Sequence, residues 1–449
     1  MKLSLARVIA AFAVGLLITF ASLNAGFNGG NGNNVGGVSI DPAGVVRSAT
    51  IEENQTLVDL LRNDAKVPQG DLREASELRM VSLAGLQEAI LEARETGARL
   101  APEIQFMAGL TGIEYVLVDE DKDDLILAGP AEPWTLADDG SIVGEKTGKA
   151  VLQLEDLVVA LRSVELARAE GISCSIESTD EGRKRLIAFQ RKMRLRPGQN
   201  PKAFEAGMKQ ALGPQVIRLN GVPASSRYAC TMVAADYQMK RLAMALIDSP
   251  VKGLPSYLQM ARNATHTGNE NPRWWMECNY DALSRNESGT IWKLAGQGVK
   301  TMTEQDVIDR QGQAKASGRS SKLASKWADL MTEHFEQLAG EMPVFGELQN
   351  LMDLTVVSTL IVQERLEQRS GLDLAVLRDD EVLEPIAFVV PQTIAPECSF
   401  IKGRSGWTVT ASGGVSVSGF QVVQDQTVDP ALSLQVASNE GGSWWWNHR

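Results

Sequence analysis

The sequence predicts an α+β fold made as a single large body, with a mixed α/β central block and β-hairpins toward both ends. The central part of the chain alternates apolar strand-like runs with amphipathic helical patterns, which is typical of mixed helix and sheet layers. The composition is that of an ordinary globular protein, 44% hydrophobic and 22% charged. The length of 449 residues also allows two lobes, which we expect to divide near Pro250.

The chain begins with a segment that resembles an export signal. Lys2 and Arg7 are followed by the apolar run Val8–Leu23, which is shorter than the roughly 20 residues of a bilayer-spanning helix. We therefore expect residues 1–25 to be a signal peptide and the protein to be periplasmic or secreted. The alternative is an uncleaved segment that tethers the chain to a membrane outside the cytoplasm, which would be its only membrane contact.

A Gly/Asn-rich stretch at residues 26–37 predicts a flexible linker before the first lobe, residues 38–250. Val38–Arg47 alternates around an Asp-Pro-Ala-Gly turn and predicts a hairpin, and Leu57–Arg99 has a helical pattern. Next, we expect a pair of strands, then a helix and a strand: Ile113–Val118, Leu125–Ala128, Leu152–Glu170 and Ile172–Ile176. Further on, we expect helices over 180–194 and 201–212, a strand over 215–219, and a long helix from Ser225 or Ser226 to Ile247.

The second predicted lobe covers residues 251–424, and a loose tail follows at 425–449. Its pattern predicts short strands, a polar loop, two helices and a final β-rich part: 273–275, 290–294, 298–303, 311–322, 323–338, 348–367 and 392–424. The motif Gly36–Ile40 recurs in similar form as Gly413–Val417, which predicts two similar hairpins.

The four cysteines, Cys174, Cys230, Cys278 and Cys398, have no zinc or haem spacing, and no cofactor is predicted. In an exported protein, three full pairings are possible, and we favour a Cys174–Cys398 disulfide. Cys230 falls within a predicted helix, where a small buried residue is the commoner role.

An acidic turn between two predicted strands carries the weak metal candidates Asp119, Asp121 and Asp123. Their spacing resembles a calcium loop, but Asp124 and Pro130 stand where an EF-hand has Gly and Glu, so a solvated turn is favoured. Gly144–Ala150 imitates a phosphate loop but is one residue too short and lacks its hydroxyl, which argues against a nucleotide. The net charge of −12 argues against nucleic acid as a partner.

Two clusters are candidate binding residues. Arg183, Lys184 and Arg185 open a basic helical segment that could dock an envelope polymer or an acidic protein partner, although a solvated helix face is the favoured interpretation. Arg273, Trp274 and Trp275 offer aromatic rings for stacking. Neighbouring strand residues point to opposite faces, so we expect one of the two tryptophans to lie in the core.

Histidine is the usual base of Ser/His/Asp and Cys/His hydrolases, and the chain has only His266, His334 and His448. His334 falls on an apolar helix face, whereas His266 lies in a polar loop and is the better catalytic candidate. Paired carboxylates, as in glycosidases, remain open because the 56 acidic residues conceal any pair.

Several segments together resemble an exported family of planctomycete bacteria known as domain of unknown function 1598. The similarity runs from about Val38 to Gln424 and implies an exported bacterial protein, without an activity or a catalytic residue to carry over. The segments that carry it are Ile113–Trp134, VLQLEDLVVALR (Val151–Arg162), CSIESTDEG (Cys174–Gly182), ADYQMKRLAM (Ala235–Met244), GLPSYL (Gly253–Leu258), RWW (Arg273–Trp275), GQGVKTMTE (Gly296–Glu304) and PVFGELQNLMDLTVV (Pro343–Val357).

These observations lead to two functional hypotheses. The first is a non-catalytic envelope protein that binds or scaffolds a polymer or a partner protein. The alternative is an envelope hydrolase acting on polysaccharide or peptidoglycan, with carboxylates as acid and base or His266 as base.

Overall fold

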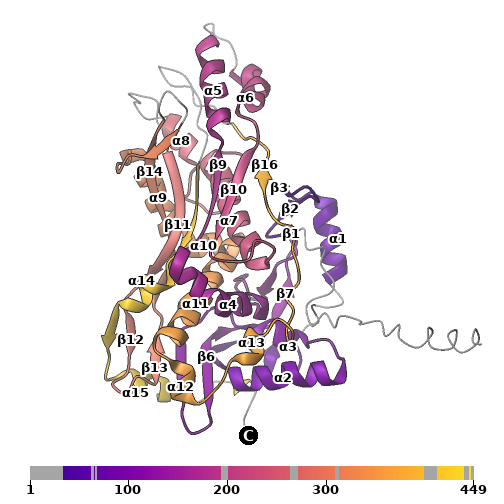
Figure 1. Ribbon diagram of the computed structural model, residues 1–449, viewed down its shortest axis with the longest axis vertical. Helices are drawn as coiled ribbons and strands as arrows, with labels where there is room; N and C mark the ends of the chain where they lie inside the picture. Colours follow the sequence, from indigo (N-terminus) through magenta and orange to yellow (C-terminus); the bar gives the residue numbers. More distant parts are fainter. Residues whose placement is uncertain are drawn as a thin grey trace, which may run out of the picture.

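The computed structural model describes residues 34–61, 65, 68–193, 201–262, 272–308, 313–398, 412–438 and 444–445. These residues form two large β-sheets, a two-stranded ribbon and helices that pack between and around the sheets (Figure 1). Because helices and strands share one body, the predicted α+β class is confirmed. Among the described residues, no helix combines the length and apolar character needed to cross a bilayer.

The larger sheet has ten strands and takes neighbours from distant parts of the chain. The pairs β3/β16 and β17/β11 are parallel, and the other pairs are antiparallel. In spatial order the strands are β1 (Asn34–Val35), β2 (Val38–Ile40), β3 (Val45–Ser48), β16 (Thr393–Ile394), β10 (Gln215–Asn220), β9 (Ile172–Ser178), β17 (Ser412–Val417), β11 (Pro272–Tyr280), β14 (Gly296–Ile308) and β15 (Ala314–Ala316).

The smaller sheet has seven strands and is built around the predicted hairpin at the acidic turn. In spatial order its strands are β18 (Gln426–Val428), β12 (Leu283–Arg285), β13 (Ile291–Lys293), β5 (Tyr115–Asp119), β6 (Asp124–Ala131), β4 (Ser76–Ser82) and β19 (Trp444–Trp445). The separate ribbon consists of β7 (Trp134–Leu136) and β8 (Ile142–Gly144).

Three long helices form the centre of the core: α4 (Leu154–Glu170), α7 (Arg227–Ala243) and α11 (Pro343–Gln363). α7 packs on β9 and β17, while α11 contacts both α4 and α7. The α7 helix begins where the Ser226 hydroxyl accepts a hydrogen bond from Ala229 N at 3.1 Å, so Ser226 is the N-cap of the two candidates, Ser225 and Ser226, that the sequence offers. Almost every residue of α11 is buried, because neighbouring elements surround it on all sides.

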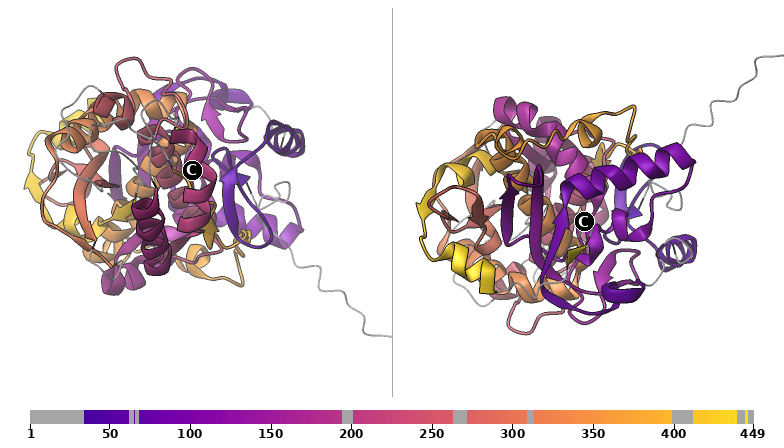
Figure 2. Two further views of the ribbon diagram at one scale, coloured as in Figure 1. Left: turned by 90° about the horizontal axis from the view of Figure 1, so that it is seen from above. Right: turned by 90° about the horizontal axis from the view of Figure 1, so that it is seen from below.

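The other helices lie around this centre, and Figure 2 shows α1 at the edge of the body in both views. Besides three short 3₁₀ turns (Gly70–Arg73, Met107–Gly109 and Pro201–Phe204), they are α1 (Ile51–Leu61), α2 (Leu83–Thr96), α3 (Pro102–Gln105), α5 (Asp180–Lys192), α6 (Glu205–Leu212), α8 (Tyr257–Arg262), α9 (Lys322–Glu333), α10 (Phe335–Glu341), α12 (Leu366–Ser370), α13 (Ala375–Arg378), α14 (Gly419–Gln424) and α15 (Leu432–Ser438).

Several predicted elements were wrong. The helical pattern of Leu57–Arg99 is interrupted by β4, in which Leu78–Ser82 are all buried and so give no polar/apolar alternation to reveal a strand. The recurrence of Gly36–Ile40 does not make two hairpins, because β17 is a central strand between β9 and β11. The β-rich segment that we expected up to residue 424 ends in helix α14.

The favoured Cys174–Cys398 disulfide was also wrong, since both cysteines are free. Cys174 lies in the main core, whereas Cys398 packs in a separate small cluster with Leu186, Met208 and Leu212. Cys230 is buried within α7, as expected, and its thiol lies 3.8 Å from the Val389 carbonyl oxygen.

Candidate functional site

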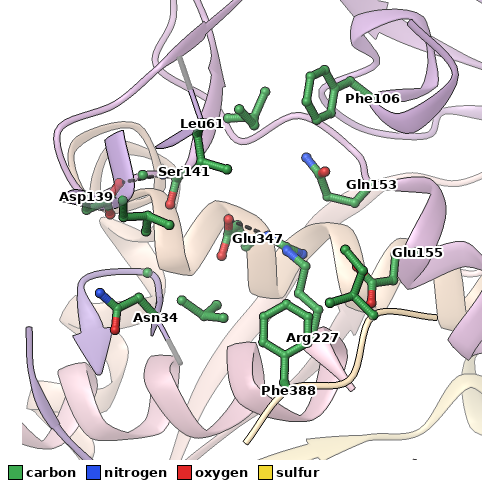
Figure 3. A pocket seen from close by; sticks show the side chains of 16 residues that line it. Asn34, Leu61, Phe106, Asp139, Ser141, Gln153, Glu155, Arg227, Glu347 and Phe388 are labelled. Carbon is green, nitrogen blue, oxygen red and sulfur yellow. Dashed lines mark hydrogen bonds and ion pairs between the residues drawn. The ribbon is translucent and has the colours of Figure 1, made fainter. Parts of the chain in front are cut away.

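A small cavity of about 100 Å³ opens at the amino ends of the three central helices (Figure 3). Residues from β1, α1, the β7–β8 ribbon and the segment after α13 complete its wall. The lining residues are Asn34, Val35, Gly36, Leu57, Leu61, Phe106, Asp139, Gly140, Ser141, Ile142, Gln153, Glu155, Arg227, Glu347, Ile386 and Phe388.

Arg227 is the only basic residue in the described part of the cavity wall, and it pairs with two buried carboxylates. One guanidinium nitrogen, Nη1, donates a hydrogen bond to Asp156 Oδ2. The other, Nη2, donates to Glu347 Oε1 at 2.5 Å. The side chains of Asp156 and Glu347 are 3% and 4% exposed, so these ion pairs are formed almost out of contact with water.

The helices explain why these charges meet. Arg227 is the first residue of α7, and Glu155 and Asp156 lie in the first turn of α4. Glu347 follows within two turns of the start of α11 at Pro343. Helix amino ends carry partial positive charge, which helps to offset the cost of placing carboxylates at the start of α4.

Burial shifts the protonation equilibria of this cluster. Desolvation, strengthened by the neighbouring charge of Asp156, raises the pKa of Glu155 to about 8 even though Arg227 opposes the shift. Desolvation likewise raises the pKa of Glu347 to about 7, and it raises the pKa values of Asp156 and Asp139. Burial would lower the pKa of Arg227, but the carboxylates outweigh it and raise that pKa.

Three carboxyl oxygens of the cluster are left without a hydrogen-bond partner among the described residues. They are Glu155 Oε1, Asp156 Oδ1 and Glu347 Oε2. Glu347 points into the centre of the cavity beside Arg227, and Glu155 lies on its rim toward the segment after α13 (Figure 3). Buried carboxyl oxygens are normally satisfied, so the oxygens of Glu155 and Glu347, which line the cavity, mark it as a place where a donor from outside the described chain fits; Asp156 is not part of the lining.

The weak metal candidates of the acidic turn lie elsewhere, at the tip of the β5–β6 hairpin, in the turn that the sequence analysis favoured as solvated. Asp121 and Asp123 are exposed, and Asp119 Oδ1 accepts a hydrogen bond from Lys122 N at 3.1 Å. Among the described residues, no set of three His, Cys, Asp or Glu side chains is placed to hold a metal ion.

The predicted basic cluster lies on α5, which projects with α6 from one end of the body (Figure 1). Arg183 donates to the Ser178 carbonyl oxygen and pairs with Asp180, and Arg185 donates to the Ala211 carbonyl oxygen at 3.0 Å. Two of the three side chains are therefore engaged with the protein's own main chain. Exposed basic residues of the same helix, at positions 184, 191 and 192, are better suited to a charge-reversal test of docking.

Strand β11 separates the predicted aromatic residues onto two faces, as expected from its alternation. Trp274 is buried in edge-on contacts with Tyr257 and Trp327. Trp275 is half-buried on the other face, where Arg273 lies over its ring and its indole Nε1 donates to Glu277 at 2.9 Å. Only Arg273 and Trp275 can thus share a binding surface.

Only one of the three histidines, His334, lies among the described residues, and it does not line the cavity. His266 and His448 lie outside the described residues. His334 is half-buried at the end of α9, next to Gly253, rather than within one continuous helix over 323–338.

Sequence reasoning missed the three carboxylates around Arg227, which belong to Glu155, Asp156 and Glu347. The available signal was weak: Glu347 interrupts the largely apolar start of its helix and Glu155 and Asp156 precede the apolar run Leu157–Leu161, which suggests buried charge but identifies no partner. Arg227 lies 71 residues from Asp156 and 120 residues from Glu347 along the chain, and only the packing of α4, α7 and α11 brings them together.

One family model matches part of this chain. Residues 174–257 match the family described as protein of unknown function (DUF1598). The matched segment runs from β9 through α7 into α8 and so includes Arg227 but none of the carboxylates around it. No curated protein and no solved structure matches the chain.

Proposed function

We propose that this protein is an exported, non-catalytic binding protein of the bacterial envelope and that the cavity around Arg227 is its ligand site. The signal-like residues 1–25 and the resemblance to an exported planctomycete family support the location. The match of residues 174–257 to a family of unknown function is compatible with either functional hypothesis.

The observation that carries the binding role is the Glu347 carboxyl within the cavity, whose Oε2 and the facing Ser141 hydroxyl both lack a well-formed hydrogen bond among the described residues. An unsatisfied buried carboxylate costs several kcal/mol, because its hydration is lost without replacement. Such a group persists where a ligand completes its hydrogen bonds in the working protein. The cavity of about 100 Å³ holds a few non-hydrogen atoms, whereas typical pockets for whole organic ligands measure roughly 300–1,000 Å³.

One observation favours the alternative, an envelope hydrolase. Glu155 and Glu347 have pKa values of about 8 and about 7, which is the range suited to general acid and base groups. A glycan chain, however, needs a far longer cleft than this cavity provides. The geometry therefore supports binding better than glycan cleavage.

A pocket-filling variant tests the proposed function. We expect protein purified from its native envelope to carry a bound small molecule in native mass spectrometry, and Ser141→Leu, which fills the cavity wall, to lose it. Ser320→Leu at an exposed position is the matched control and should keep the bound mass. A wild-type protein without bound mass, or a Ser141→Leu protein that retains it, would contradict the proposal.

The same preparation decides between the two functions. Incubation with purified peptidoglycan and envelope polysaccharide should release no fragments above a protein-free blank. Fragment release that disappears in Glu155→Gln would establish the hydrolase instead.

A further inference from the structure

The cavity around Arg227 offers hydrogen-bond acceptors in excess of donors. The carboxylates around the Arg227 guanidinium are those of Asp156, Glu347 and Glu155, and Asp139 acts on Glu347 from the loop between β7 and β8. Glu155 and Glu347 line the cavity, and one oxygen of each lacks a hydrogen-bond partner among the described residues. We infer that the cavity binds the protonated amino group of a small ligand, an ammonium cation that donates to these oxygens. This inference rests on the proposed function, since it names the chemistry of the same site.

Charge decides against an anionic ligand. The groups that face Glu347 are Arg227 from α7, Asp156 from α4, and Asp139 and the Ser141 hydroxyl from the loop between β7 and β8. With both partners of Arg227 ionised, the guanidinium is already outnumbered by carboxylates. The carboxylates would repel an added anion, whereas an ammonium group supplies up to three hydrogen-bond donors and one positive charge.

The remaining wall indicates what the amino group is attached to. Leu61 and Phe106 form an apolar side of the cavity above Glu347 (Figure 3), and Leu57, Ile142 and Phe388 also belong to its lining. This apolar side suits a short alkyl chain, which would gain from leaving water. A primary alkylammonium therefore fits both the volume of about 100 Å³ and the division of the wall into polar and apolar parts.

Cation binding should be coupled to release of a proton. The pKa values of Glu155 and Glu347, about 8 and about 7, keep these carboxyls largely protonated at pH 6. An ammonium group favours their ionised forms, so the affinity should rise as the pH increases. If one carboxyl with a pKa near 7 must ionise before the cation binds, the ionised fraction and hence the affinity rise about tenfold between pH 6 and pH 8.5.

The test uses n-propylammonium chloride as the probe in isothermal titration calorimetry of the ligand-stripped full chain. We expect binding at pH 8.5 that weakens at least about tenfold at pH 6, with proton release visible as a dependence of the heat on the buffer near pH 7. The isosteric n-propanol and the anion propionate should bind at least about tenfold more weakly than propylammonium. Equal binding of propanol, or an affinity that does not change with pH, would overturn the inference.

Variants place the probe in the cavity. Glu347→Gln should weaken propylammonium binding at least about tenfold, while Glu95→Gln on the exposed face of α2 should leave it unchanged. If Glu347→Gln does not fold, Glu155→Gln takes its place, and the pH series on the wild-type protein still decides. Unchanged propylammonium binding in a folded cavity variant would contradict the inference.

The outcomes separate this inference from the proposed function. The probe is tested up to 100 mM, a concentration about tenfold above the dissociation constant of a weak 10 mM site. If propylammonium does not bind at that concentration and the co-purified ligand has no amino group, the ammonium ligand is refuted and the binding role is kept. Absence of both a co-purified ligand and probe binding would refute the two together.

Discussion

At the scale of single residues, Arg227 determines the chemistry of the cavity. Its guanidinium pairs with Asp156 and Glu347, and the nearby Glu155 has no partner of its own for Oε1. Removing Arg227 would leave buried carboxylates uncompensated, which costs more than the ion pairs contribute. Protonation of part of the cluster near neutral pH reduces the number of buried negative charges and so lowers the cost of this arrangement to the folded state.

The pH dependence of stability should show this directly through Glu155→Gln. The pKa of Glu155 is about 8 in the folded protein and about 4.5 in an unfolded chain, so the folded state holds a proton that the unfolded state releases between these values. Wild-type stability should accordingly fall as the pH rises through this window, and glutamine removes the effect. Relative to wild type, we expect the variant to gain about 2–3 kcal/mol between pH 5.5 and pH 8.5.

Urea denaturation at the two pH values measures the change, and Glu95→Gln serves as the exposed control. A stability difference between Glu155→Gln and wild type that is the same at both pH values would show that Glu155 titrates normally.

The acidic cavity could not be predicted from the sequence, whereas individual caps could. Ser226 was recognisable as an N-cap because its partner lies three residues away. The partners of Arg227 become neighbours only through tertiary packing. The wrong Cys174–Cys398 disulfide has the same cause, because cysteine spacing gives no information about which cluster each thiol joins.

At the scale of elements, β17 joins the final part of the chain to the centre of the larger sheet. It runs antiparallel to β9 and parallel to β11. Beneath it, the buried Lys240 of α7 pairs with Asp236 at 2.7 Å and donates to the carbonyl oxygens of Gly413 at 3.4 Å and Ile176 at 3.3 Å. These bonds connect α7 to two adjacent strands, so the strand and the helix should lose structure together.

Gly413→Ala tests how closely β17 is fitted. A Cβ at Gly413 would lie 1.5 Å from the Trp274 carbonyl oxygen, a distance that forces the backbones of β17 and β11 apart. We expect a loss of more than about 3 kcal/mol in urea denaturation, or failure to accumulate as soluble protein. Gly97→Ala is the control, because Gly97 has φ +65° but open space around it, and its cost should be about 1 kcal/mol. Equal costs for the two variants would show that β17 is loosely held.

The elements that the sequence predicted well are those with local signals. Helix α4, which ends at Gly171, and the β5–β6 hairpin each have a clear period and a recognisable end. Strand β17 has a short pattern similar to that of an edge hairpin, and only its remote partners make it central. Its position therefore depends on long-range pairing that periodicity does not encode.

At the scale of the whole molecule, one continuous core extends across Pro250. It includes Leu157 and Met232 from the first predicted lobe and Trp327 and Leu354 from the second. This core is assembled without a disulfide among the four cysteines. A chain of 449 residues buries enough apolar surface to fold without such cross-links, so free cysteines do not argue against a location outside the cytoplasm.

Export is the property on which the proposed function depends most, and a reporter fusion tests it. Residues 1–37 joined to alkaline phosphatase should give an active enzyme in a bacterial host, because that reporter needs disulfides that form outside the cytoplasm. Leu17→Arg places a charge within the apolar run and should abolish the activity. Mass spectrometry of the mature amino terminus then separates a cleaved signal from a retained tether. Activity no greater than that of a leaderless fusion would place the protein in the cytoplasm and remove the envelope from the proposal, while the acidic cavity would still call for a cationic ligand there.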